Sequence, residues 1–173
     1  QNTPGLEGAQ GLEAAQIARS LGDFAAGEWR PLTRKGDTVG ARWADGKVTM
    51  PAGYREAYRA YVEGGWGTIG VPEEFGGQGL PFAVQCAVLE TLGSANMGFA
   101  LAPILSVGAI EALQHHGTPE QQATWLPKLA TGELVGAIAM TEPGAGSDLQ
   151  ALRTSARLDG DEYVVNGSKT FIT

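Results

Sequence analysis

The chain has 173 residues, of which 43% are apolar and 18% are charged, which is the composition of a folded globular protein and argues against intrinsic disorder. Its net charge of −7 and its scattered Lys and Arg residues argue against a nucleic-acid-binding surface. No window holds about 18 uninterrupted apolar residues and no signal-peptide plan opens the chain, so we expect a cytoplasmic protein without a membrane span.

The first segments of the chain are predicted to be helical. Apolar residues at helical intervals predict a helix over residues 12–29, and Pro31 and Gly36 are expected to end it. Residues 33–53 are rich in turn formers, with Asp45-Gly46 between two short extended pieces. We interpret them as an excursion from a helical body.

Three further helices are predicted from apolar periodicity. Residues 54–62 carry an apolar and tyrosine-rich stripe that is expected to face the core, and Gly64 ends the pattern. Residues 82–92 and 99–114 are apolar on all sides, which predicts helices buried within a bundle. The single cysteine, Cys86, lies in this apolar part and is expected to be buried.

The end of the helical region carries clear helix boundary signals. His115-His116-Gly117 is typical of a helix C-terminus, and a metal site at the two histidines is not predicted, because adjacent helical positions diverge by about 100°. Thr118-Pro119-Glu120-Gln121 predicts a capping box with proline at the first helical position. The helix that follows is disturbed by Pro127 and is expected to end near Gly132.

After Gly132 the pattern changes from helical to strand-like. Residues 134–140 form a short apolar run, and hairpin-type turns at Asp159-Gly160 and Asn166-Gly167 predict strands over 162–165 and 169–173. We therefore predict an α+β fold: an all-α domain over 1–132, then the beginning of an antiparallel β domain over 133–173. Because the last predicted strand is open at its end, we expect a fragment of a larger fold.

A glycine-rich loop, "AMTEPGAGSD" over residues 139–148, stands out within the β region. It lacks the third glycine and the following helix of a dinucleotide-binding fingerprint, and it lacks the Gly-Lys-Ser/Thr ending of a phosphate loop. Its glycines and the hydroxyls of Thr141 and Ser147 suit close approach by a ligand. A surface turn with Glu142 and Asp148 in solvent is the alternative.

Two spaced motifs in this region resemble the flavin-binding signature of the acyl-CoA dehydrogenase family. They are Met140–Asp148 and Val164–Thr173. The helical part resembles the amino-terminal domain of the same family at residues 72–79 and 117–122. Residues 31–37 and 51–58 are similar to the branch that includes 3-methylmercaptopropionyl-CoA dehydrogenase, and the resemblance covers nearly the whole chain.

The resemblance implies a flavoprotein oxidoreductase of fatty acid metabolism, which uses FAD for α,β-dehydrogenation of acyl-CoA thioesters. It implies a middle domain of β-barrel type, and a carboxy-terminal four-helix bundle that this chain lacks and that holds the glutamate base. No catalytic residue is therefore assigned in this chain. Ser147 is also implied to contact the acyl-CoA substrate, and the implied cofactor-binding residues are Ile138, Met140, Thr141, Gly146, Ser147, Phe171, Ile172 and Thr173.

The resemblance also implies partners. These are the acyl-CoA substrate, an electron-transferring flavoprotein as acceptor, and further copies of the chain in a homo-oligomer, a dimer or tetramer. Glu142 and Asp148 are expected to fix the loop, Glu142 by capping nearby amides and Asp148 by ordering the turn, and not to serve as catalytic base. An acyl-CoA oxidase or flavin monooxygenase on the same fold, and a non-catalytic helical module that binds a partner, remain as alternatives.

Overall fold

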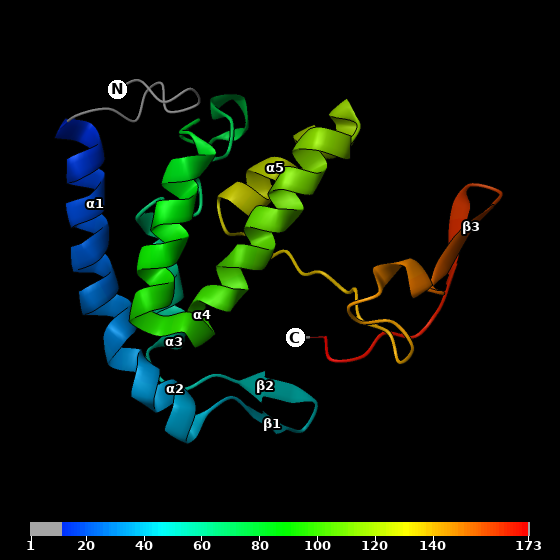
Figure 1. The fold of residues 1–173 in the computed structure, drawn as a ribbon, viewed down its shortest axis with the longest axis horizontal. Helices are drawn as coiled ribbons and strands as arrows, with labels where there is room; N and C mark the ends of the chain where they lie inside the picture. The colour runs from blue at the N-terminus through cyan, green and yellow to red at the C-terminus, as the bar shows by residue number, and fades with distance from the viewer. Residues whose placement is uncertain (1–11, 173) are drawn as a thin grey trace. The chain divides into compact units, whose positions relative to one another are not determined.

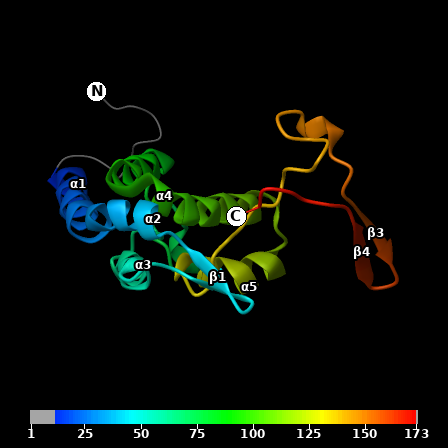
Figure 2. The same cartoon turned by 90° about the horizontal axis from the view of Figure 1, so that it is seen from below.

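The computed structural model describes residues 12–172 and divides into two compact units, which meet between Gly136 and Ala137. We call residues up to Gly136 the helical unit and residues from Ala137 on the loop–hairpin unit. Figure 1 labels the helices and strands except β4, which is labelled in Figure 2. They are α1 (Leu12–Phe24), α2 (Thr33–Val39), β1 (Arg42–Ala44), β2 (Lys47–Thr49), α3 (Tyr54–Glu63), α4 (Phe82–His116), α5 (Pro119–Ala130), β3 (Ser155–Asp159) and β4 (Glu162–Asn166).

The first helix continues beyond its predicted end. After α1 a π-helical turn (Ala25–Trp29) and a 3-10 turn (Arg30–Leu32) lead directly into α2. Pro31 is tolerated because it lies in the first turn of the 3-10 segment, where no backbone N–H is needed. Gly36 is needed for packing: a Cβ there would overlap the Tyr54 hydroxyl. The prediction that Pro31 and Gly36 end the helix is therefore wrong.

The predicted excursion around Asp45-Gly46 is confirmed as the β1–β2 hairpin. Ala44 pairs with Lys47, so the loop has two residues, and both have left-handed φ values, 50° at Asp45 and 74° at Gly46. This is the combination that a type I′ turn requires and that Asp-Gly supplies readily.

The core of the helical unit is aromatic and has Trp29 at its centre. The Trp29 side chain is fully buried and stacks on Phe99 with ring centroids 4.3 Å apart. From α3, Tyr54, Ala57 and Tyr61 are buried against this pair, which confirms the predicted tyrosine-rich stripe. The intervals of three and four residues that predicted the helix also place these side chains on its buried face.

Helix α4 is two helical halves joined at Asn96, which has the non-helical angles φ −156° and ψ 88°. The Asn96 side chain donates to the Trp29 carbonyl (3.2 Å) and accepts from the Phe99 amide (3.1 Å), so it holds the junction to the core. The two halves match the two predicted helices. The prediction that these helices are buried on all sides is wrong, because Leu101 is 56% exposed. Cys86, which was expected to be buried, is exposed as well.

By length and composition α4 qualifies as a candidate membrane span, contrary to our expectation, with a mean hydropathy of 1.5 over its best window. That expectation rests on uninterrupted apolar runs, whereas a mean hydropathy can stay high when single polar residues interrupt the apolar ones. The buried amide of Gln85 accepts a bond from the Gly70 amide, and that of Asn96 bonds to Trp29. Helices packed in the core of a protein make such polar contacts with neighbouring segments.

The predicted capping box at the start of α5 is confirmed. The Gln121 amide donates to the Thr118 hydroxyl (3.3 Å), and the Thr118 amide donates to the Gln121 side chain (2.9 Å). Pro119 occupies the first helical position, and Leu126 and Ala130 face a second apolar cluster with Val71.

We expect Thr118→Ala to lower the free energy of unfolding of the helical unit by about 1 kcal/mol, because the Gln121 amide loses its acceptor. Thr124→Ala is the matched control: its hydroxyl bonds only to the Glu120 carbonyl inside the same helix, and alanine is the better helix former. Denaturant titrations followed by circular dichroism measure both. Equal losses for the two variants would contradict the capping role.

The loop–hairpin unit holds one of the predicted hairpins. Strands β3 and β4 pair from Ser155–Asn166 to Asp159–Glu162, and Gly160 has the left-handed φ of 63° in the two-residue loop between them. Figure 2 shows the two strands side by side. The turn predicted at Asp159-Gly160 is confirmed.

The strands predicted over 134–140 and 169–173 are not formed in the described residues. In the 134–140 segment, the Leu134 amide donates to the Lys128 carbonyl and the Gly136 amide donates to the Ser106 hydroxyl. These amides therefore bond to helix residues and are not available for pairing with a neighbouring strand. At the second, Phe171 has a left-handed φ of 57°, which is incompatible with an extended strand, and Thr173 lies outside the described residues.

Candidate functional site

The motif loop folds back on itself directly after Thr141. The Glu142 amide donates to the Ala145 carbonyl (2.9 Å), and the Ala145 amide donates to the Glu142 carbonyl (3.1 Å). Pro143 and Gly144 form the turn between them, and proline at the first central position presets the backbone angle that such a turn needs. Ala145 is buried, so the turn is fixed at both of its ends.

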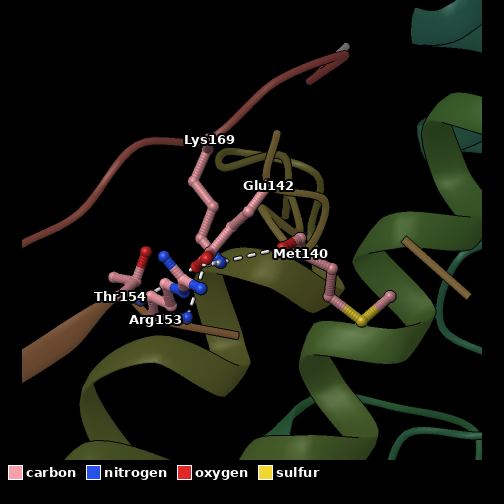
Figure 3. A network of polar contacts seen from close by, with 5 residues as sticks. All are labelled: Met140, Glu142, Arg153, Thr154 and Lys169. Atoms are coloured by element: carbon pink, nitrogen blue, oxygen red, sulfur yellow. Dashed lines mark hydrogen bonds and ion pairs between the residues drawn. The ribbon is translucent and has the colours of Figure 1, made fainter. Parts of the chain in front are cut away.

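The Glu142 carboxylate lies at the centre of a polar network (Figure 3). It accepts hydrogen bonds from the backbone amides of Arg153 (2.8 Å) and Thr154 (3.0 Å). It also forms an ion pair with the Lys169 ammonium at 2.9 Å. The side chain is only 6% exposed, so the alternative of a solvated Glu142 is wrong, and the prediction that it caps amides is confirmed.

These donors favour the ionised form of Glu142. The Thr154 side chain beside the carboxylate, then the Arg153 amide and the Lys169 ammonium, lower its pKa to about 2. A carboxylate with so low a pKa accepts a proton poorly at neutral pH. In this structure Glu142 therefore acts as a structural anchor of the loop.

Lys169 joins the two motifs that are separate in the sequence. Its ammonium donates to the Met140 carbonyl (2.8 Å) as well as to Glu142, and the next residue donates from its amide, Thr170 N–H to the Thr141 carbonyl (2.9 Å). Residues 140–142 and 169–170 are therefore in contact, although the bonded side chains and carbonyls are 27 to 29 positions apart in the sequence.

Sequence reasoning missed the roles of Lys169, Arg153 and Thr154. Arg153 and Thr154 act through their backbone amides, and such a contact cannot be predicted from the type of the side chain. Lys169 lies in the second motif and Glu142 in the first, so opposite charges in two co-occurring motifs were the one signal that pointed to this contact.

The predicted cofactor-binding residues lie on the surface of the loop–hairpin unit. Thr141 is half-buried, whereas Gly146, Ser147 and the apolar members are exposed, with Phe171 the most exposed at 90%. Lys169 and Thr170 bring Met140 and Thr141 to the chain segment that continues into Phe171 and Ile172. No hydrogen bond within the described residues ties Ile138, Gly146 or Ser147 to that segment, and Thr173 lies outside the described residues.

Gly146 fits close approach by a ligand. A Cβ built there meets no atom within 4 Å, and its φ is not left-handed, so neither packing nor backbone geometry in the described chain requires glycine. Gly144 is equally open. The prediction for Asp148 is wrong: its carbonyl accepts from the Ala151 amide (3.2 Å), but its side chain caps no amide.

Titratable side chains elsewhere do not gather into a metal centre. Within residues 12–172, no three His, Cys, Asp or Glu side chains are grouped as metal ligands would be. His115 instead lies 3.3 Å from Glu111, one turn earlier on α4.

Comparison with known proteins gives two family matches that together span nearly all described residues. Residues 12–133 match the amino-terminal domain, and residues 137–173 the middle domain, of acyl-CoA dehydrogenases. The chain is 43% identical over 162 residues to 3-methylmercaptopropionyl-CoA dehydrogenase of Ruegeria pomeroyi, covering 93% of this chain and 28% of that protein. It therefore spans less than a third of the length of that relative.

Solved structures agree with these matches. The fold is similar to that of a glutaryl-coenzyme A dehydrogenase in complex with glutaryl-CoA, with a TM-score of 0.83 and 26% identity over 94% of this chain and 40% of that one. An acyl-CoA dehydrogenase from Bacillus anthracis complexed with FAD has a TM-score of 0.77 and 32% identity, over 99% of this chain and 27% of that one.

Proposed function

This chain belongs to the acyl-CoA dehydrogenase family, and on that premise we propose that the whole protein catalyses FAD-dependent α,β-dehydrogenation of acyl-CoA thioesters. One observation supports the proposal above the others. The segments 140–142 and 169–170, which belong to two motifs of the family's flavin-binding signature, are joined by hydrogen bonds and an ion pair. The two motifs thus form one surface.

The residues present fit FAD in chemical type. Met140 and Phe171 offer exposed apolar side chains to a flat ring, and Thr141 offers a hydroxyl and an amide to its polar edge. Open space at Gly146 suits the diphosphate, beside the Ser147 hydroxyl, which we also assign to the acyl-CoA. Ile138, Ile172 and Thr173 complete the proposed set. When bound, FAD supplies the electron sink for hydride from the acyl β carbon.

The residues of this chain bind and orient; they do not take the α proton. Glu142 is held by three donors with a pKa of about 2, and Asp148 lies on an exposed turn. We assign the base to a glutamate outside this chain. The exposed apolar side chains of the loop–hairpin unit would exclude water from the reacting atoms once FAD and substrate cover them.

The remaining partners follow from the same proposal. An electron-transferring flavoprotein would accept the electrons, the protein would work as a homo-oligomer, and it would be cytoplasmic. With this reaction, the protein would act in the oxidation of acyl chains.

Binding of FAD is the first test of the proposal. We expect Gly146→Val to weaken FAD binding at least about tenfold, because a branched side chain would occupy the space proposed for the diphosphate. Gly144→Val is the matched control, since it lies in the same loop with equally open surroundings but has no proposed contact. Titration of the apo form of the intact gene product with FAD, followed by flavin fluorescence, measures both. A colourless protein with no affinity for FAD would contradict the proposal and favour a non-catalytic helical module.

The reaction itself separates the proposal from its enzymatic alternative. Anaerobic addition of acyl-CoA to the FAD-bound protein should bleach the visible flavin absorbance, and recovery in air should be slow. Rapid recovery with formation of peroxide would instead assign an oxidase.

A further inference from the structure

We propose that Lys169 is a positioning residue that orients and polarises the Met140–Thr141 peptide, so that the Thr141 N–H becomes a strengthened donor to bound FAD. This inference rests on the proposed function, and it deepens the account of the same site. It starts from the Lys169 ammonium, which contacts both a backbone carbonyl and the carboxylate of the first motif.

The position of Lys169 is fixed from two sides. Its ammonium lies 2.8 Å from the Met140 carbonyl and 2.9 Å from Glu142 Oε1, and the side chain is only 24% exposed. Glu142 is in turn fixed by the Arg153 and Thr154 amides. A charged donor held in this way is pre-organised, which strengthens its bond to the carbonyl.

The geometry of the Met140–Thr141 peptide bond determines the direction in which the Thr141 N–H points. The described chain has no cis peptide, and in a planar trans peptide the carbonyl of Met140 and the N–H of Thr141 point in opposite directions. With the carbonyl fixed on Lys169, the N–H points away from it. Among residues 12–172 no acceptor bonds this N–H, although the Thr141 carbonyl is bonded by the Thr170 amide.

Polarisation then follows from the charge. A cation at a carbonyl oxygen draws electron density through the peptide and makes the N–H of the same unit a better donor. Reduced flavin carries more negative charge than oxidised flavin, so a stronger donor and a nearby cation both favour the reduced form. Both therefore raise the reduction potential of the bound FAD. Glu142 offsets part of the Lys169 charge at 2.9 Å.

The two partners of the ion pair therefore have opposite predicted effects on bound FAD. Lys169→Met removes the cation and should lower the midpoint potential of the bound FAD. Glu142→Gln leaves the cation without its counter-charge and should raise that potential. A purely structural role for the pair predicts looser binding in both variants, with no opposite shift.

The experiment uses the intact gene product loaded with FAD. Potentials are measured by dye-equilibrated reduction and FAD affinity by titration of the apo form. We expect Lys169→Met to weaken FAD binding about tenfold, because the Thr141 N–H is then neither oriented nor polarised, and to lower the potential of the bound FAD. Lys169→Arg should restore both values toward wild type. Arg157→Met, which removes an exposed cation paired with Asp159 on β3, should change neither.

Three outcomes would overturn the inference. Equal potentials in wild type, Lys169→Met and Glu142→Gln would remove the electrostatic role. Shifts of the same sign in both variants would reduce the pair to a structural contact. Failure of the wild-type protein to bind FAD would overturn the proposed function itself, and this inference with it. Circular dichroism of each variant distinguishes a lost fold from a lost contact.

Discussion

Replacement of Trp29 by alanine is expected to lower the free energy of unfolding of the helical unit by about 3–5 kcal/mol. The Trp29 ring is fully buried and stacks on Phe99 at 4.3 Å, with Tyr61 at 5.6 Å and Phe24 at 6.2 Å between ring centroids. Removal of the indole leaves a cavity among rigid rings that cannot collapse to fill it, and the surrounding rings lose their contacts.

Trp43→Ala is the matched control, because that indole is 73% exposed on β1 and its loss should change stability by no more than about 0.5 kcal/mol. Trp29→Phe should cost less than Trp29→Ala. It keeps a stacked ring and removes the buried Trp29 Nε1–H, which has no hydrogen-bond acceptor among residues 12–172. Denaturant midpoints from circular dichroism rank the three variants. A Trp29→Ala protein as stable as Trp43→Ala would show that the core is not centred on Trp29.

Helices with local signals were predictable from the sequence. The capping box at Thr118 and Gln121 depends on residues three positions apart, and the stripe of α3 depends on spacings of three and four. The Asp45-Gly46 and Asp159-Gly160 turns are likewise decided by the backbone freedom of their own residues. Each of these signals lies within a few residues of the structure it determines.

Elements that depend on distant partners were not predictable in the same way. Gly36 suggests the end of a helix until Tyr54, eighteen positions later, is seen to occupy the space that its missing side chain leaves. The apolar run over 134–140 suggests a strand, but its amides at Leu134 and Gly136 bond to helix residues. In both cases a tertiary contact outweighs the local propensity.

The candidate site was predictable as motifs and not as a network. The two flavin motifs are visible in the sequence, yet nothing in it states that Lys169 reaches Met140 and Glu142. That contact matters because Glu142 and Ala145 are the only buried residues among 137–172. With so little apolar burial, hydrogen bonds and the Lys169–Glu142 ion pair, and not a hydrophobic core, hold the described part of the loop–hairpin unit together.

Acid is therefore expected to loosen the loop–hairpin unit before it affects the helical unit. The pKa of Glu142 is about 2 in the folded protein, against an ordinary value of 4.5. Between these values the unfolded state binds more protons than the folded state, so the stabilisation from Glu142 is fully present above about pH 4.5 and is lost as pH falls toward 2.

Hydrogen exchange at the amides of Arg153 and Thr154 measures this loss directly, because both donate to the Glu142 carboxylate. After correction for intrinsic exchange rates, their protection should fall steeply between about pH 4.5 and pH 2 in the wild type. In the Glu142→Gln variant, these two amides should already be poorly protected at pH 6 and should lose little further protection in acid. The reason is that a carboxamide has one acceptor oxygen, whereas the two amides use both oxygens of the carboxylate. Glu162→Gln, on the exposed β4 strand, removes a carboxylate that makes none of these bonds and should follow the wild type. Protection at Arg153 and Thr154 that stays constant down to pH 2 would show that Glu142 does not hold the two motifs together.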